Sequence, residues 1–193
     1  MKKLTIPEMH RLSVDEFHEA KKMPLVVVLD DVRSLYNVGS VFRSSDAFRV
    51  EAIYLCGITA TPDEVCSVDG TMIRDCTLKA SQEIHKTALG AENSVAWRYF
   101  PTAAEAVTQL KADGYTILAV EQCHGSVMLN DFTPTFSDNK KYAVVLGNEV
   151  KGVHQDVIDI CDGCLEIPQY GTKHSLNVSV TAGIIIWHFG SKL

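Results

Sequence analysis

The sequence predicts an α/β fold in which a mostly parallel sheet has helices on both faces. Short apolar runs typical of strands alternate with segments of helical periodicity. The run at residues 25–29 is continuous and rich in β-branched side chains, as expected of a strand covered on both faces. With 193 residues, the chain is long enough to bury a substantial core.

The expected strands are at residues 25–29, 52–56, 97–100, 115–120, 142–146 and 165–167. A short N-terminal helix should begin at Ser13, because Ser13 and Glu16 have capping-box spacing, and should end before Pro24. Further helices are expected at residues 37–48, 102–111, 154–161 and 177–189. The segment 57–91 has no clear period, and we expect part of it to be helical.

Composition limits the classes of function. The net charge of −6 argues against a protein that simply coats nucleic acid. The first residues do not resemble a secretory signal, and the longest apolar run, 183–189, is too short to cross a bilayer. We therefore expect a cytoplasmic protein that does not insert into a membrane.

Six cysteines do not indicate a disulfide framework in such a protein, because cytosolic thiols are normally reduced. Cys161 and Cys164 form an isolated CxxC pair. A structural zinc site would need a second ligand pair at suitable spacing, and the sequence offers none. We expect no metal and no redox role for this pair.

The most informative stretch lies near the end of the chain. Pro168 should end the last strand, Gly171 gives a polar loop its freedom, and Ser175 and Asn177 stand where a helix would begin. One interpretation is that Ser175 or Asn177 only caps that helix. The other is a ligand site at the carboxyl end of a strand. The helix itself is apolar almost all round, which predicts that it is buried.

Three loops that follow predicted strands contain glycines and polar residues, without the GxGxxG pattern of a Rossmann fold. The patterns are Asn37-x-Gly39-x-x-x-Arg43, Leu146-Gly147-Asn148-Glu149-x-x-Gly152 and Ile167-Pro168-x-x-Gly171-x-x-x-Ser175-Leu176-Asn177-Val178. In this order and at these separations, they resemble the three motifs of the SpoU (TrmH-type) RNA ribose methyltransferases of the SPOUT superfamily.

The resemblance implies a single SPOUT domain over residues 1–193, with residues 1–24 as a short helical extension and a deep trefoil knot in the C-terminal part. It implies S-adenosylmethionine as cofactor, held by main-chain groups around Leu146, Gly147, Ile167 and Leu176. A glycine at a strand end agrees with this, because it lets backbone approach a ligand closely. The resemblance also implies a homodimer with sites completed across the interface, for which the helix 177–189 is a candidate.

The implied reaction is methyl transfer to the ribose 2′-hydroxyl of an RNA nucleotide. By resemblance Arg43 is the catalytic residue, Asn37 orders its loop, Glu149 supports the site, and Ser175 and Asn177 position groups near the cofactor. Proposals for the family make the arginine a general base. Because a guanidinium is normally always protonated, we favour phosphate binding and orientation by Arg43 and leave deprotonation open.

Several alternatives remain open at this level. Glu149 could instead be an acidic cap of the helix that follows Gly152. Arg49 stands where the family often has glycine, which should affect only a turn. Residues 1–24 and 57–91 are the segments that could select the RNA substrate. Because compact members of the family often act on tRNA, we expect tRNA rather than ribosomal RNA. A non-catalytic dimeric RNA-binding protein and a SPOUT base methyltransferase are the competing functions.

Overall fold

The computed structural model describes residues 1–5, 7–63, 67–68, 71–72, 77–137 and 140–192. Its strands are β1 (Met23–Asp30), β2 (Val50–Cys56), β3 (Ser67–Val68), β4 (Thr71–Met72), β5 (Trp97–Phe100), β6 (Tyr115–Val120), β7 (Val127–Met128), β8 (Lys141–Leu146) and β9 (Gly163–Glu166). The α-helices are α1 (Val14–Glu19), α2 (Leu35–Ala47), α3 (Leu78–Ala88), α4 (Ala103–Ala112), α5 (Gln155–Asp159) and α6 (Val178–Gly190). Short 3₁₀ turns are η1 (Pro7–Met9), η2 (Ala91–Asn93) and η3 (Leu129–Asp131).

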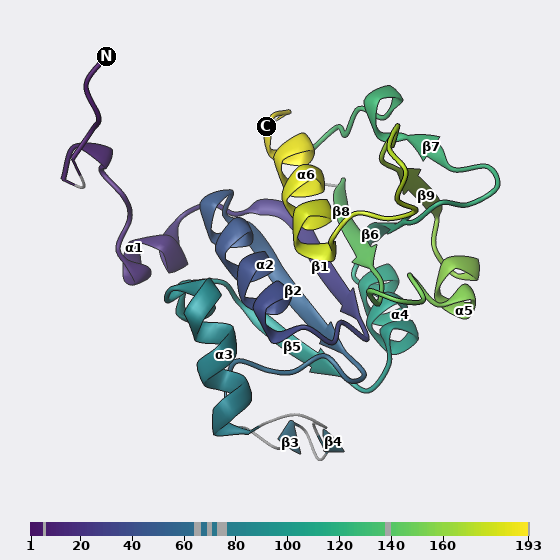
Figure 1. Ribbon diagram of the computed structural model, residues 1–193, viewed down its shortest axis with the longest axis horizontal. Helices are drawn as coiled ribbons and strands as arrows, with labels where there is room; N and C mark the ends of the chain where they lie inside the picture. The colour runs from purple at the N-terminus through teal and green to yellow at the C-terminus, as the bar shows by residue number, and fades with distance from the viewer. Residues whose placement is uncertain (6, 64–66, 69–70, 73–76, 138–139, 193) are drawn as a thin grey trace.

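Seven strands form one sheet in the order β5-β2-β1-β8-β6-β9-β7, and each neighbouring pair is parallel. Strands β3 and β4 pair antiparallel with each other. Figure 1 shows α2 and α6 side by side on one face of the sheet, with α4 on the opposite face. The predicted α/β class, with a parallel sheet and helices on both faces, is confirmed.

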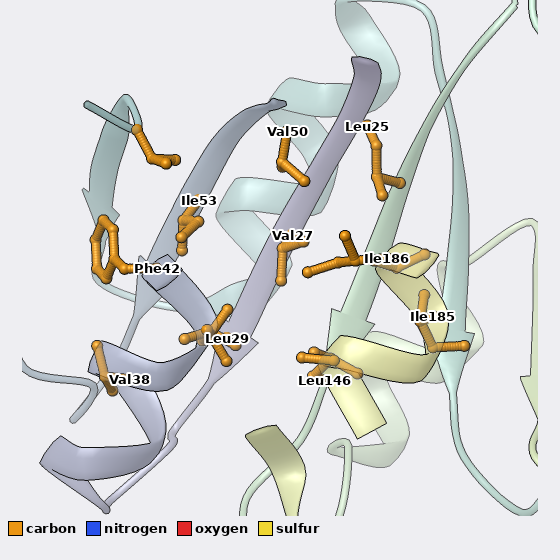
Figure 2. Packing of buried hydrophobic residues seen from close by; sticks show 14 of the residues in the cluster. Leu25, Val27, Leu29, Val38, Phe42, Val50, Ile53, Leu146, Ile185 and Ile186 are labelled. Carbon is orange, nitrogen blue, oxygen red and sulfur yellow. The ribbon is translucent and has the colours of Figure 1, made fainter. Parts of the chain in front are cut away.

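The inner strand β1 is buried on both faces because its apolar side chains alternate between two clusters. Leu25, Val27 and Leu29 pack under α2 and α6, whereas Val26 and Val28 pack toward α4. Figure 2 shows the side chains of α2 and α6 that lie beside this strand: Val38, Phe42, Ile185 and Ile186. Burial of each such side chain stabilises the fold by about 1.5–3 kcal/mol, so this contact fixes both helices on the sheet.

The predicted elements differ from the observed ones mainly at their ends. Helix α1 begins with both hydrogen bonds of the Ser13–Glu16 capping box. Strand β1 begins at Met23 and includes Pro24, and its pairing with β2 shifts register between Met23 and Val26. The predicted last strand extends to residue 167, but β9 ends at Glu166. Strand β7 was not predicted, because two exposed residues give no periodic signal.

The segment 57–91 lacked a clear sequence period, and among its described residues α3 is helical. Residues 64–66, 69–70 and 73–76 of this segment lie outside the described part of the chain. Helices α2 and α3 pack closely at Gly39. A β-carbon at Gly39 would lie 2.2 Å from the carbonyl oxygen of Ile84 and 2.2 Å from Thr87 Oγ1. The glycine of the first motif is therefore explained by helix packing.

Helix α6 is buried on one side only. Its inner side chains belong to the core, but Val180 is 51% exposed and Trp187 is 60% exposed. The prediction that this helix is buried is therefore confirmed for its inner face and wrong for its outer face, which stays exposed in the single chain. In the part of the chain described here, no helix combines the length and apolar character needed to cross a bilayer.

Candidate active site

A cavity of about 300 Å³ lies at the carboxyl ends of the neighbouring strands β8, β6 and β9. This is the usual place for a ligand in a parallel sheet, because the loops after adjacent strands converge there. Leu146, Gly147, Ile167 and Leu176, the four residues expected to hold a cofactor, all line it. The remaining lining residues are Val120, Glu121, Gln122, Asn148, Glu149, Val150, Lys151, Gly152, Leu165, Glu166, Gln169, His174, Ser175, Val178 and Thr181.

The loop after β8 is a tight turn. Asn148 and Gly152 exchange two backbone hydrogen bonds, of 3.0 and 2.9 Å. The side chain of Asn148 accepts from Val150 N at 2.9 Å and donates to the carbonyl of Asp31 at 2.7 Å, which ties the turn to the end of β1. These bonds hold Glu149 near the tip of a fixed loop.

Gly147 lines the cavity and is also required by this turn. A β-carbon at Gly147 would lie 2.0 Å from the carbonyl carbon of Gly152 and 2.1 Å from Val153 N. The space that a side chain would fill is therefore occupied by the chain's own backbone. Glycine is required here because the two ends of the turn are in contact, which is a reason the sequence did not show.

Glu149 joins this loop to the loop that precedes α2. Its carboxylate accepts hydrogen bonds from Arg33 N, Ser34 N and Asn37 Nδ2, each at 3.0 Å. The alternative that Glu149 caps the helix after Gly152 is wrong, because these donors belong to the start of α2. The second motif thus holds the first one in place.

Asn177 joins the third motif to the first. Its Nδ2 donates to Asn37 Oδ1 at 3.1 Å, while its Oδ1 accepts from Ser179 N at 2.9 Å and caps α6. The capping interpretation is therefore correct but incomplete, because the same amide has a second partner. Asn37, Glu149 and Asn177 form one connected group from three distant parts of the chain.

The protonation state of Glu149 follows from these contacts. Burial alone would raise the pKa of Glu149, but the hydrogen bonds from Arg33, its own amide, Asn37 and Ser34 outweigh burial, and the pKa is lowered. The carboxylate is therefore ionised near neutral pH. With both oxygens engaged and a low pKa, Glu149 is suited to holding loops rather than to accepting a proton.

The other two predicted residues are placed differently. Ser175 is exposed and lines the cavity. Arg43 is exposed on α2 and does not line the cavity within one chain. The structure therefore groups Asn37, Glu149 and Asn177, places Ser175 and Glu149 on the cavity wall, and leaves Arg43 outside the cavity.

Two cavity residues were missed from the sequence, although they directly follow a predicted strand. Glu121 accepts from Val153 N at 3.1 Å, and Gln122 Nε2 donates to the carbonyl of His174 at 2.7 Å. The first contact holds the loop after β8 and the second holds the loop after β9. Their position directly after a predicted strand was the signal in the sequence, and it did not distinguish them from solvated residues.

The charged groups on the cavity wall are mostly acidic. The cavity is lined by three glutamates, Glu121, Glu149 and Glu166, whereas Lys151 is the lysine among the lining residues. Aliphatic side chains make up much of the rest of the wall: Val120, Leu146, Leu165, Ile167, Leu176 and Val178. Such a wall favours a ligand with a positive charge and an apolar ring.

Three side chains at the end of β1, those of Asp30, Asp31 and His154, have atoms of the kind that bind metal ions within 4.8 Å of one another. Their contacts in the protein explain this grouping. Asp30 Oδ2 accepts from His154 N at 3.2 Å, and Asp31 Oδ1 accepts from Ile58 N at 2.9 Å. Asp30 is only 3% exposed, and burial raises the pKa of its carboxyl group.

The CxxC thiols face backbone carbonyls. Cys161 Sγ lies 3.1 Å from the carbonyl of Val157, and Cys164 Sγ lies 3.1 Å from that of Glu121. Burial raises the pKa of Cys161 to about 11 and that of Cys164 to about 12. Both groups are therefore neutral thiols near pH 7, which disfavours nucleophilic use.

The chain is similar to a known family of methyltransferases. The model of the SpoU rRNA Methylase family matches residues 63–187 of the chain. The 23S rRNA (guanosine-2′-O-)-methyltransferase RlmB of Neisseria meningitidis serogroup B is 27% identical over 172 residues, covering 89% of this chain and 60% of that protein.

Two solved structures have the same fold. The AdoMet-bound rRNA methyltransferase from Sinorhizobium meliloti has a TM-score of 0.73 at 22% identity, covering 92% of this chain and 60% of that chain. The A. aeolicus TrmH/SpoU tRNA modifying enzyme has a TM-score of 0.71 at 24% identity, covering 93% and 81%. The chain spans about 60% of the length of the curated relatives, such as the Neisseria protein.

Proposed function

Because the chain belongs to the SpoU rRNA methylase family, we propose that it is an S-adenosylmethionine-dependent methyltransferase of RNA ribose 2′-hydroxyls. The observation that supports this best is the group formed by Asn37, Glu149 and Asn177. It connects three separate motifs beside a cavity at the carboxyl ends of parallel strands. A protein that only bound RNA would have no need for both the cavity and this group.

The cavity fits S-adenosylmethionine in its charge and its polarity. The acidic residues on the wall suit a cationic sulfonium, and the aliphatic ones suit an adenine ring. We propose that Leu146, Gly147, Ile167 and Leu176 hold the cofactor through main-chain and aliphatic contacts. When bound, the cofactor supplies a methyl group on a positively charged sulfur.

The residues of the chain have separate tasks in this proposal. Glu149 and Asn37 fix the loop at the start of α2, and Ser175 positions polar groups at the cavity mouth. Arg43 binds an RNA phosphate and orients the 2′-hydroxyl, because a planar, always charged guanidinium recognises phosphate well. A hydroxyl held in line reacts faster than a free one, since the cost of orientation has been met on binding.

We propose that the protein acts as a homodimer. The exposed apolar side chains Val180 and Trp187 on α6 support this, because a second copy would remove them from water. Arg43 lies outside the cavity within one chain, and a dimer would let it serve the site of the partner. We further propose, from the family, that the C-terminal segment forms the deep trefoil knot and that the protein is cytoplasmic.

The RNA class is tRNA in our proposal, and ribosomal RNA is the alternative. The A. aeolicus structure is named as a tRNA modifying enzyme, and the Neisseria relative as a 23S rRNA enzyme. Purified protein should be incubated with labelled S-adenosylmethionine and, separately, with bulk tRNA and ribosomal RNA. We expect label in tRNA as a ribose-methylated nucleoside, identified by mass spectrometry after complete digestion.

The outcomes separate the competing functions. Label in ribosomal RNA alone would replace the tRNA assignment, and a base-methylated nucleoside would indicate a base methyltransferase. Calorimetry beside the transfer assay tests the cofactor. A folded protein that binds RNA but not S-adenosylmethionine would be a non-catalytic RNA-binding protein, and the proposal would be wrong.

A further inference from the structure

Glu121 lies directly after β6, on the cavity wall, with its carboxylate between two loops. Oε1 accepts from Gln122 N at 2.9 Å, and Oε2 accepts from Val153 N at 3.1 Å. Both donors are neutral backbone amides. Across the described part of the chain, no lysine, arginine or histidine forms an ion pair with Glu121. Its negative charge is therefore not neutralised by the protein.

The other two carboxylates on the wall are engaged differently. Glu149 accepts from three donors at the start of α2, and Glu166 accepts from Ser126 Oγ at 2.6 Å. Glu149 is thus committed to holding its loop. The Glu121 carboxylate instead accepts from main-chain amides of the loops after β6 and β8.

The chain is shaped to receive this carboxylate at close range. Gly152 has a φ of +71°, and a β-carbon there would lie 2.0 Å from Glu121 Oε2. Any larger residue would push the carboxylate away as well as strain the turn. The position of Glu121 against Gly152 and Val153 is therefore part of the construction of the cavity.

We propose that Glu121 is the specificity-determining residue by which the cavity distinguishes the charged cofactor from its neutral product. This inference rests on the proposed function. S-adenosylmethionine has a positive sulfonium, whereas S-adenosylhomocysteine, the product of methyl transfer, has a neutral thioether. An unpaired carboxylate on the wall attracts the first and not the second, so it strengthens cofactor binding and favours product release.

A purely structural role for Glu121 makes a different prediction. If Glu121 only held the Val153 amide, removing its carboxylate would weaken the binding of both ligands to the same extent. Glu121→Gln separates the two roles, because a glutamine oxygen can still accept from Val153 N while the charge is removed. The contact with Gln122 N is lost, and this loss of a loop contact should act on both ligands alike. The ratio of the two affinities is the readout that a structural role would not change.

The experiment is calorimetry of both ligands with the wild-type chain, Glu121→Gln and the control Glu19→Gln, which removes an exposed carboxylate on α1 outside the cavity. The wild type should bind S-adenosylmethionine more tightly than S-adenosylhomocysteine. In Glu121→Gln, the affinity for S-adenosylmethionine should fall about tenfold while that for S-adenosylhomocysteine changes less than about twofold. Glu19→Gln should leave both affinities and their ratio near those of the wild type.

Each contrary result has a distinct meaning. Equal losses for both ligands in a folded Glu121→Gln protein would reduce Glu121 to a loop contact and overturn the inference. The same change of ratio in Glu19→Gln would assign the effect to the overall charge of the protein and would overturn the inference too. If Glu121→Gln does not fold, the wild type alone still tests the inference. Tighter binding of S-adenosylhomocysteine than of S-adenosylmethionine by the wild type would reject it. A wild type that binds neither ligand would instead reject the proposed function.

Discussion

The side-chain amide of Asn37 donates a hydrogen bond to the Glu149 carboxylate across 3.0 Å, although the two residues are 112 positions apart in the chain. The same carboxylate accepts the backbone amides of Arg33 and Ser34 at 3.0 Å. Because one carboxylate satisfies three donors from the start of α2, the loop after β8 and the loop after β1 cannot move independently. This contact makes the cavity wall and the Asn37 region one unit.

Asn37→Ala and Glu149→Ala should therefore be non-additive. Each change leaves a hydrogen-bonding partner unsatisfied and should lower the free energy of unfolding by about 1–2 kcal/mol. The double variant should be less destabilised than the sum of the single variants, by about 1 kcal/mol. Urea titrations of the four proteins measure this difference. Strict additivity would mean that the contact contributes nothing.

Gly147→Ala and Gly171→Ala form a matched pair of changes in the two loops at the cavity. A β-carbon at Gly147 would lie 2.0 Å from backbone, whereas at Gly171 it would have nothing within 4 Å. We expect Gly147→Ala to lose about 2 kcal/mol or more of stability, and Gly171→Ala to change it by less than about 0.5 kcal/mol. Thermal unfolding of both variants is the measurement. Equal effects would show that the turn at Gly147 adjusts freely.

The sheet was predictable because its strands are continuous apolar runs, such as residues 25–29, whose burial depends on local composition. Asn37, Glu149 and Asn177 were identified by resemblance to motifs, but their mutual contacts were not, because sequence order says nothing of which loops meet. Glu121 was missed since a single acid after a strand is indistinguishable from a solvated one. The outer face of α6 was misjudged because periodicity does not tell a core from an interface.

Asp30 should make stability depend on pH. Burial raises the pKa of Asp30 above its usual value of 3.8, although the contacts with His154 act in the opposite direction. The folded chain therefore favours the protonated form of Asp30. The stability that comes from this preference is lost as the pH rises through the pKa that Asp30 has in the folded chain. Asn at this position avoids the buried charge and can still accept from His154 N.

We expect Asp30→Asn to match the wild type at about pH 4 and to exceed its Tm by about 2 °C or more at pH 7. Thermal scans from about pH 4 to pH 7 measure the difference, with Asp159→Asn as a control on an exposed helix position. A wild type more stable than Asp30→Asn at neutral pH would mean that the His154 contact outweighs burial.

The outer face of α6 tests the proposed dimer. Trp187 is 60% exposed, and a charge there would have to be buried against the partner. Trp187→Glu should convert a species of twice the 21.3 kDa chain mass into a monomer at micromolar concentration. The control is Leu78→Glu, which changes a leucine that is 54% exposed on α3, a helix that Figure 1 shows apart from α6. Light scattering that gives a monomer for the wild type would refute the dimer.

Arg43 provides the sharpest test of the proposed reaction. It lies on α2, the helix whose start is fixed by Glu149, but it is exposed and does not line the cavity of its own chain. If Arg43 holds an RNA phosphate in the transition state, it acts on the RNA and not on the cofactor. Arg43→Ala should then bind S-adenosylmethionine like the wild type, while methyl transfer falls by about two orders of magnitude.

Arg43→Lys should restore little of the activity, because an ammonium lacks the planar set of donors that matches a phosphate. Arg98→Ala, which removes another exposed arginine from the edge strand β5, should leave transfer near the wild-type rate and controls for the loss of one positive charge. Transfer of labelled methyl groups to tRNA, measured beside cofactor binding by calorimetry, gives both quantities. A solvated surface arginine would leave all three variants nearly as active as the wild type, so substantial transfer by Arg43→Ala would remove Arg43 from the mechanism.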